Sequence, residues 1–197
     1  MLHFHVTLRD VENPVVWRDI EVPATYTFDQ FHKVLQIVFG WSDYHLYEFT
    51  DRKDNLDKGT FRISIPSEYD AEYEEKTYNA RKKKLQSVFP KTKQLTYFYD
   101  FGDSWNFEIL CEGTSKANDY PFAHCSDGAG ATPPEDCGGT GGYKAMKHSF
   151  EEQDDEVESF REWLGLKSNE NWDPNFFPTQ IRRYINIALA YLHGEEQ

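Results

Sequence analysis

Four carboxylates stand in two stretches that indicate turns or strand ends. Asp100 and Asp103 flank a Phe-Gly pair in YFYDFGDSW, and Glu135 and Asp136 follow two prolines in TPPEDCGGTGGY. Scaffolds commonly present functional groups at such places. Together these side chains could bind a hard divalent cation or exchange protons with a substrate. Each could instead serve its own turn by accepting hydrogen bonds from nearby amides, and both interpretations stay open.

Several better-known motifs lack their usual surroundings. The DFG triplet has neither the Gly-rich loop nor the His-Arg-Asp sequence of protein kinases. GGTGGYKAM lacks the P-loop spacing and no GxGxxG occurs, so the sequence holds no nucleotide-binding motif. A zinc site on Cys125, Cys137 and His124 would need a fourth ligand, and no second close pair of ligands exists. We therefore expect free thiols and assign no metal, with a divalent cation as the open alternative.

Composition predicts one domain. The chain has 197 residues, which suffice for one core and are too few for two ordinary domains with a linker. Hydrophobic residues make up 39% and aromatic residues 16%, so the chain should fold despite its 28% of charged residues. We expect a single α+β domain over residues 1–197, with a core over about 1–150 and a helical segment over about 151–197.

Cysteine usage and charge bear on location and partners. Three cysteines without CxxC spacing, and an N-terminus without signal-peptide features, favour the cytoplasm and no membrane segment. The net charge of -13 opposes direct binding to DNA, because a protein that neutralises phosphates needs a basic face. The basic run at residues 80–93 is interpreted as a solvated charged segment. A protein partner stays open.

The N-terminal residues predict a β-hairpin. LHFHVTL, residues 2–8, alternates apolar and polar residues as a half-buried strand does, and VVWRDIEV, residues 15–22, follows after a polar turn. His3 and His5 then share the outer face. We expect them to face solvent rather than to form a metal pair.

Residues 27–39 carry nearly every helix signal. Thr27 can form a capping box with Gln30, an apolar stripe follows, and Gly40 suits a left-handed C-cap. His32 falls off that stripe, so we expect it to be exposed.

Further elements complete a ββαββ order. YHLYEFTDR and TFRISIP predict two strands within the first 66 residues. Residues 66–93 are polar and charged, and we interpret them as a mobile connection with one short helix around residues 85–89.

The carboxylate-bearing stretch YFYDFGDSW predicts a β-hairpin with a two-residue turn. Gly at the first central position is what a type II′ turn requires, which places Gly102 and Asp103 in the turn with φ > 0 at Gly102. The register then pairs Asp100 with Trp105, Phe98 with Phe107, and Thr96 with Ile109. Asp100 would lie at the edge of an aromatic face and would need a partner there.

The C-terminal part predicts a long loop and then helices. Six glycines and two prolines between Ser126 and Gly142 argue against a regular element there. DDEVESFREWLG and PTQIRRYINIALAYLHG have helical periodicity. The predicted fold is therefore α+β: a mostly antiparallel sheet of the ββαββ type with a packed helix, an additional hairpin and a helical C-terminus.

The order of several motifs resembles the Ri-plasmid ORF-3-like family. The resemblance rests on LRDVENPVVWRDIEVP, FGWSDYHLYEF, YFYDFGDSW and CSDGAGATPPEDCGGTGGY, and runs from about residue 2 to the end of the Gly-rich loop. The shared elements fall on Trp17, Arg18, Trp41, His45, Phe49, Tyr99 to Asp103, Trp105, Pro133 to Asp136, Gly138, Gly139, Gly142 and Tyr143. The sequence departs from many relatives at Phe107 and Thr132, where they have His and Cys. The resemblance implies an association with mobile elements and no defined activity.

The family pattern implies that His45, the hairpin tip and the Glu-Asp loop meet. The candidate catalytic residues are His45, Asp100, Asp103, Glu135 and Asp136, and the candidate binding residues add Trp41, Trp105 and Tyr143. We expect a non-enzymatic ligand- or protein-interaction module, because no nucleophile-base pair or cofactor motif is present. One alternative is a metal-assisted hydrolase, with the carboxylates around a divalent ion and His45 as general base. The other is a nucleic-acid accessory protein, which rests on the family association.

Overall fold

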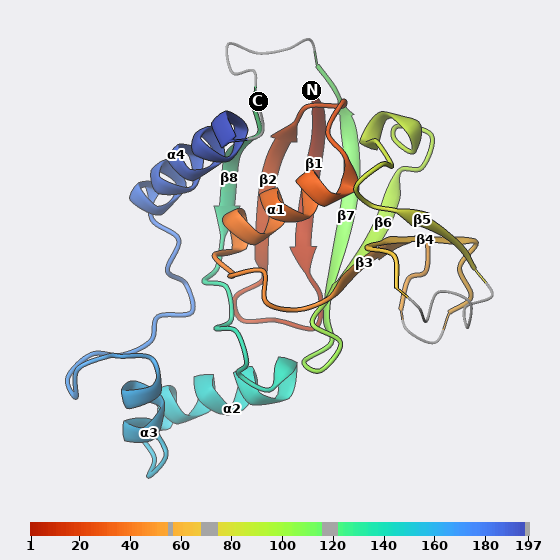
Figure 1. Ribbon diagram of the computed structural model, residues 1–197. Coiled ribbons are helices and arrows are strands. Elements are labelled where there is room, and N and C mark those ends of the chain that lie inside the picture. Colours follow the sequence, from red (N-terminus) through yellow and green to blue (C-terminus); the bar gives the residue numbers. More distant parts are fainter. Residues whose placement is uncertain (55–56, 68–74, 116–121, 196–197) are drawn as a thin grey trace.

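A computed structural model of the chain describes residues 1–54, 57–67, 75–115 and 122–195. Its described strands form one sheet of eight in the order β5-β4-β3-β6-β7-β1-β2-β8. Neighbouring strands are antiparallel except β4 and β5, which are parallel. The predicted α+β class with a mostly antiparallel sheet is confirmed (Figure 1).

The predicted N-terminal hairpin and helix are both present. β1 (Leu2–Leu8) pairs with β2 (Val16–Val22), with Phe4 opposite Ile20. Helix α1 (Phe28–Phe39) begins with the capping box of Thr27 and Gln30 and ends at Gly40, whose φ of 72° is left-handed. α1 lies across one face of the sheet (Figure 1).

The core between α1 and the sheet is aromatic. Phe28 and Phe31 of α1 meet Phe49 of β3 with ring centroids 5.0 and 5.6 Å apart, and Phe31 also meets Phe4 of β1 at 4.9 Å. Offset and edge-on rings at these separations add to the stabilisation that their burial provides. At the other end of α1, Phe39 meets Phe107 of the sheet with ring centroids 4.6 Å apart, and the loop with His45 leaves from this end.

The outer half of the sheet contains one strand that the sequence did not predict. β3 (Tyr47–Thr50) and β4 (Phe61–Ser64) occupy the two predicted strand regions. β5 (Lys76–Asn79) adds to β4 in parallel, within the stretch interpreted as a mobile connection. Residues 68–74 of that stretch lie outside the described residues. The short helix expected nearby is the 3-10 turn η2 (Leu85–Ser87).

The carboxylate-bearing hairpin is present, but the predicted turn and register are wrong. β6 (Gln94–Tyr99) and β7 (Trp105–Thr114) pair Tyr99 with Trp105, so Asp100 leaves the strand. The connection has five residues, and Asp100 and Ser104 rather than Gly102 have positive φ, at 55° and 57°. Asp100 Oδ1 accepts hydrogen bonds from the amides of Gly102 and Asp103 at 2.9 and 3.3 Å. This side-chain turn competes with the type II′ turn and shifts the pairing by one residue.

The Gly-rich stretch is more regular than predicted. β8 (His124–Ala129) pairs with β2, and α2 (Gly139–Glu152) begins before Gly142, so the irregular part is limited to residues 130–138. Short glycine-containing strands at a sheet edge lack the alternation by which a strand is recognised. The prediction of one continuous loop over this stretch is therefore wrong.

The predicted C-terminal helices are confirmed. α3 (Val157–Trp163) follows α2, and α4 (Thr179–Glu195) packs against β8 and α1, with Ile185 and Leu189 buried in the core. Among the described residues, no helix is long and apolar enough to cross a membrane.

Candidate functional site

The loop between α1 and β3 carries His45 and is tied to the Pro133–Asp136 segment. The indole Nε1 of Trp41 donates to the carbonyl of Pro133 at 2.9 Å, and the amide of Ser42 donates to Glu135 Oε2 at 2.9 Å. These two bonds place the residues after Pro133 beside the loop. The sequence separates the two segments widely, and the fold brings them together as predicted.

Glu135 and Asp103 hold the site together. Glu135 Oε1 accepts a hydrogen bond from the Tyr99 hydroxyl at 2.7 Å. Burial, followed by the bond to Glu135, raises the pKa of Tyr99 well above its usual range, so the hydroxyl remains a donor. Asp103 Oδ2 accepts from the amide of Gly138 at 3.1 Å. Both carboxylates are thus engaged by groups of the chain itself.

Two glycines permit the close approach of these segments. A Cβ on Gly139, whose φ is 65°, would lie 2.5 Å from the carbonyl oxygen of Asp103. A Cβ on Gly142 would lie 1.7 Å from the carbonyl oxygen of Cys137. Real Cβ atoms do not approach so closely, so α2 can contact the hairpin tip only because residue 139 is glycine. The first turn of α2 can pack on the Cys137 carbonyl only because residue 142 is glycine.

His45, Asp100 and Asp136 converge, and we call them the His45 triad. Nε2 of His45 lies 3.2 Å from Asp136 Oδ1 and 3.7 Å from Asp100 Oδ2. One ligand atom from each residue lies within 4.8 Å of the other two. Asp100 is buried and Asp136 is exposed, so one side of the triad is open to solvent. Asp100 and Asp136 both have left-handed backbones, with φ of 55° and 57°.

Nε2 of His45 is shielded from solvent and makes no hydrogen bond to any described residue. Asp136 Oδ1 is within hydrogen-bonding distance, but it lies off the direction in which the ring nitrogen bonds. The ion-pair distance therefore does not satisfy the nitrogen. The three side chains form a cluster of two carboxylates and one imidazole, and the imidazole Nε2 makes no hydrogen bond to a described residue.

Of the aromatic candidates, Trp41 packs directly against Tyr99, which bonds to Glu135 of the site. Trp41 stacks on Tyr99 with ring centroids 5.1 Å apart and contacts Trp105 at 5.7 Å. Trp105 and Tyr143 are buried in the core. They can therefore affect a ligand only through the residues that they position.

His32, which the sequence predicts to be exposed, is buried, with only 1% of its surface accessible. The prediction is wrong. Nδ1 lies 2.7 Å from the Tyr97 hydroxyl and Nε2 lies 2.6 Å from Asp43 Oδ1, and the ring stacks on Tyr47 at 3.7 Å. Gln36, one turn further on, donates to the same Tyr97 hydroxyl at 3.1 Å. The polar pair at i and i+4 was the available signal for this buried network.

Arg18 was missed as a positioning residue. Its guanidinium donates to the carbonyls of Val38, Ala129 and Gly130 at 3.0, 2.8 and 3.0 Å, and it stacks over Phe177 at 3.9 Å. Burial lowers the pKa of Arg18 to about 10. The cation therefore joins the end of α1 to the segment that leads into Pro133 and the triad.

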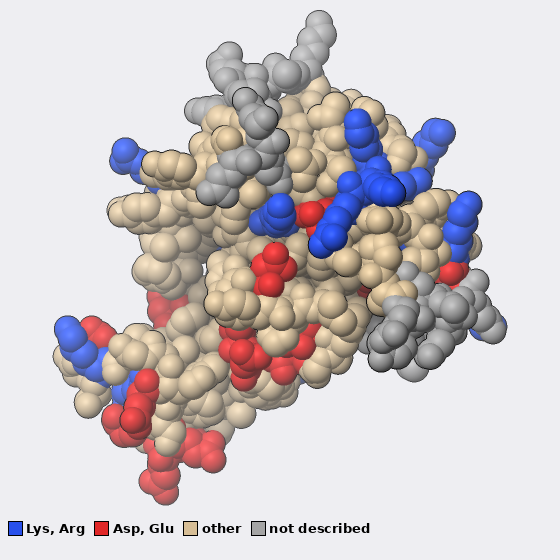
Figure 2. Space-filling view, viewed as in Figure 1, with Lys and Arg blue, Asp and Glu red and all other residues tan. Residues whose placement is uncertain are grey.

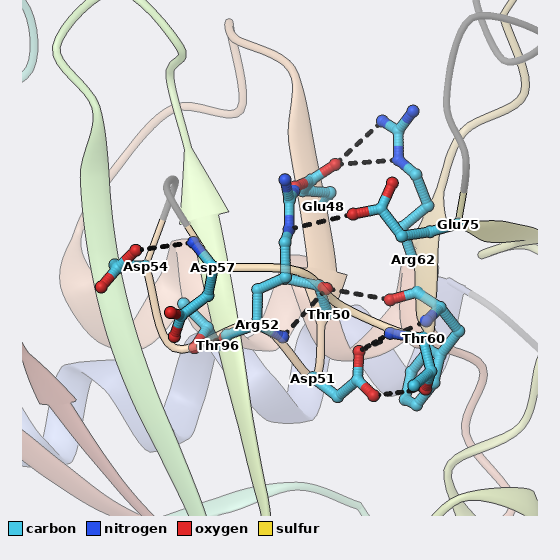
Figure 3. A network of polar contacts seen from close by, with 11 residues as sticks. Glu48, Thr50, Asp51, Arg52, Asp54, Asp57, Thr60, Arg62, Glu75 and Thr96 are labelled. Atoms are coloured by element: carbon cyan, nitrogen blue, oxygen red, sulfur yellow. Dashed lines mark hydrogen bonds and ion pairs between the residues drawn. The ribbon is translucent and has the colours of Figure 1, made fainter.

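A second carboxylate cluster lies on β3 and β4, and we call it the Glu48 network (Figure 3). Glu48 Oε2 accepts from Nε and Nη2 of Arg62, each at 2.9 Å, and Oε1 accepts from Arg52. Arg52 Nε lies 3.8 Å from Glu75 Oε1. Glu48 and Arg62 are buried, at 3% and 5% exposure. Here the chain supplies the cations that a buried carboxylate requires.

Charge is unevenly distributed over the surface. Figure 2 shows Lys and Arg side chains gathered on the side of the sheet where β5 and η2 lie, and acidic side chains gathered below α1 and over the α2–α3 end. The basic side corresponds to the run at residues 80–93. The acidic character around the triad favours cations over anions as ligands.

The sequence is similar to that of a known protein family. The sequence profile described as "Plasmid pRiA4b ORF-3-like protein" matches residues 1–180. The chain belongs to this family. Among plasmid pRiA4b ORF-3-like relatives, it is 34% identical over 193 residues to the uncharacterized protein y4hQ of Sinorhizobium fredii (strain NBRC 101917 / NGR234), covering 96% of this chain and 93% of the relative.

A solved structure has a similar fold. The crystal structure of the protein of unknown function MM3350 from Methanosarcina mazei Go1 matches with a TM-score of 0.75 at 29% identity, covering 91% of this chain and 95% of the other. The family resemblance inferred from the motifs is therefore confirmed. These relatives are described as uncharacterized or of unknown function, and a shared fold does not by itself assign an activity.

Proposed function

We propose that the protein is a non-enzymatic binding module whose site, the His45 triad, takes up a divalent cation. The observation that carries the proposal is the solvent-shielded Nε2 of His45, which faces two carboxylates without a hydrogen bond. A cation between the three side chains would give this nitrogen a directed partner and would neutralise Asp100 and Asp136.

The spacing of the atoms supports a cation. Around an octahedral ion with ligands at roughly 2.1 Å, an oxygen next to the nitrogen lies about 3.0 Å from it and well off the nitrogen's axis. Asp136 Oδ1 has this relation to Nε2, at 3.2 Å and off axis. Asp100 Oδ2 is slightly further away, at 3.7 Å. A ligand set of one imidazole and two carboxylates suits Zn²⁺ or Mn²⁺.

Hydrogen bonds within the chain hold Asp100 and the residue before Asp136 in place. Asp100 Oδ1 is held by two amides of its own turn, and the opposite oxygen, Oδ2, faces His45. Asp136 follows Glu135, which Ser42 and Tyr99 fix in place. Preorganised ligands lose little conformational entropy when they bind. Three protein ligands also leave positions on the ion open for a partner or a small molecule.

The hydrolase alternative has less support. Its scheme places the ion on Asp100, Asp103, Glu135 and Asp136 and keeps His45 as general base. Asp103 and Glu135 bond instead to Gly138, Tyr99 and Ser42, and His45 lies among the ligands. One imidazole cannot bind the ion and accept a proton from substrate through the same nitrogen.

Isothermal titration calorimetry tests the proposal. Protein freed of metal with EDTA and dialysed is titrated with Zn²⁺ and with Mn²⁺. We expect one ion per chain, and at least tenfold weaker binding in His45→Gln and in Asp136→Asn, which keeps a side chain that tolerates the left-handed backbone. Asp103→Asn is the control, because it removes a charge from the same loops, keeps a side-chain oxygen for the Gly138 amide and leaves the three triad ligands in place. Absence of binding to the wild type, or equal binding by all variants, would refute the proposal.

A further inference from the structure

A cavity of about 510 Å³ opens beside the triad. Its lining comes from α1, the loop between α1 and β3, and β3 and β4, and it includes His32 and His45. Arg81, which follows β5, and Phe101, in the turn between β6 and β7, complete it. This size is within the range of sites for small organic molecules. The cavity shares His45 with the triad, and its other features do not depend on a cation.

Ser64 provides the first sign of a ligand. Only 4% of this residue is exposed, it lines the cavity, and its Oγ makes no hydrogen bond to any residue that the structure describes. The backbone is satisfied, because the Ser64 carbonyl accepts from the amide of Ala80 at 2.9 Å. A buried hydroxyl without a partner is destabilising. A polar group of a ligand in the cavity would supply the missing hydrogen bond.

The cavity wall carries charges of both signs. Asp29 and Asp43 line it, and each uses one oxygen internally: Asp29 Oδ1 accepts from the Tyr47 hydroxyl at 2.9 Å, and Asp43 Oδ1 lies 2.6 Å from His32 Nε2. Arg81 also lines the cavity and is exposed. It follows Ala80, whose amide bonds to Ser64, so the guanidinium and the unpartnered hydroxyl stem from adjoining backbone.

The rim of the cavity is apolar and exposed. Leu46 is 69% exposed and Phe101 is 50% exposed, and both line the cavity together with Ile65. Exposed apolar side chains that line one cavity are typical of a ligand-binding groove. They would cover the apolar part of a bound molecule.

We propose that this cavity binds a zwitterion of about the size of a dipeptide with apolar side chains. The ammonium group pairs with Asp29 and Asp43, the carboxylate pairs with Arg81 and with Ser64 Oγ, and the apolar side chains contact Leu46 and Phe101. A purely anionic ligand would leave Asp29 and Asp43 without a cationic partner. A purely cationic ligand would leave Arg81 and Ser64 Oγ without an acceptor. Discrimination of this kind follows from the cost of leaving charged groups unpaired.

Binding of defined dipeptides tests the proposal. L-leucyl-L-phenylalanine and L-valyl-L-leucine are titrated in the presence of EDTA, so that the result is independent of the proposed cation. We expect one dipeptide per chain, with at least tenfold weaker binding after N-acetylation and after C-terminal amidation. The proposal is overturned if neither free dipeptide binds, or if the blocked forms bind within twofold of the free ones.

Two variants locate the site. Ser64→Ala should weaken dipeptide binding at least fivefold while leaving the thermal midpoint unchanged or higher, because an unsatisfied hydroxyl is removed. Asp43→Asn, at φ 59°, keeps a residue that accepts this backbone and should also weaken binding. Asp10→Asn, at φ 61° in the loop between β1 and β2, is the matched control and should bind normally. A more stable Ser64→Ala protein with unchanged binding would show a purely structural serine and overturn the proposal.

Discussion

The Glu48 network and the His45 triad each contain a buried carboxylate, and they differ in the partners that surround it. Glu48 is buried between Arg62 and Arg52, so the chain itself supplies the opposite charge (Figure 3). In the triad, Asp100 is also buried, but its neighbours in the cluster are a histidine, His45, and a second aspartate. In the first cluster two arginines balance the buried carboxylate, although Arg52 Nε makes no hydrogen bond to a described residue, whereas the second cluster contains no arginine or lysine among its described members. A charge cluster whose partners within the chain are insufficient is therefore a candidate binding site.

The largest expected effect is in the Glu48 network. Glu48→Gln leaves Arg62 buried without its anion, and removing one partner of a buried ion pair costs about 3 kcal/mol of unfolding free energy. Urea denaturation measures the loss. Glu108→Gln is the control, because Glu108 pairs with Arg9 at 2.6 Å with 39% of its side chain exposed, and should lose less than about 1 kcal/mol. Equal losses in the two variants would contradict the contrast between a buried cluster and an exposed pair.

The second prediction distinguishes the negative charge of Asp100 from the hydrogen bonds that its side chain accepts in the turn. Asp100→Ala removes the acceptor for the Gly102 and Asp103 amides and places a poorer residue at φ 55°, so we expect a loss of about 2 kcal/mol. Asp100→Asn keeps the acceptor and tolerates the backbone, and should lose less than about 1 kcal/mol. Urea denaturation without metal compares them. If Asn is as damaging as Ala, the charge of Asp100 is needed for folding as that of Glu48 is.

The smallest effect concerns Cys137, next to the triad. Burial, followed by the charges of Asp103 and Asp136, raises the pKa of the Cys137 thiol to about 12. The unfolded thiol ionises first, near pH 9, so this contribution to stability is complete below that pH and is lost as the pH rises toward 12. Between pH 8 and pH 10 the wild type should lose up to about 1 kcal/mol more unfolding free energy than Cys137→Ala. Identical pH dependence of the two proteins would show that the folded state does not disfavour the thiolate.

Much of the fold could be predicted because local signals agreed with the tertiary structure. The capping box at Thr27, the strand alternation at residues 2–8 and the periodicity of α4 all match the observed elements. β5 and β8 could not be predicted, since they lie at the two edges of the sheet and depend on pairing partners distant in sequence. The proposed division into a core and a C-terminal helical segment stays a prediction.

The meeting of the site residues was predicted from the family pattern and not from the register of the hairpin. The family pattern implied that His45, Asp100 and the Glu-Asp loop meet, and they do. The register argument for Asp100 was wrong by one residue, because its side chain forms the turn. Which of Glu135 and Asp136 would face His45 could not be predicted, since this depends on the left-handed backbone at Asp136 and on the donors from Ser42 and Tyr99.

Anomalous diffraction tests the central claim most directly. Crystals grown without chelator and soaked in Mn²⁺ or Zn²⁺ would be measured at the absorption edge of the metal. We predict one strong anomalous peak at roughly 2.0–2.3 Å from His45 Nε2, Asp100 Oδ2 and Asp136 Oδ1. Soaked crystals with no peak between these atoms, and with Nε2 hydrogen-bonded to a carboxylate or to water instead, would contradict the account.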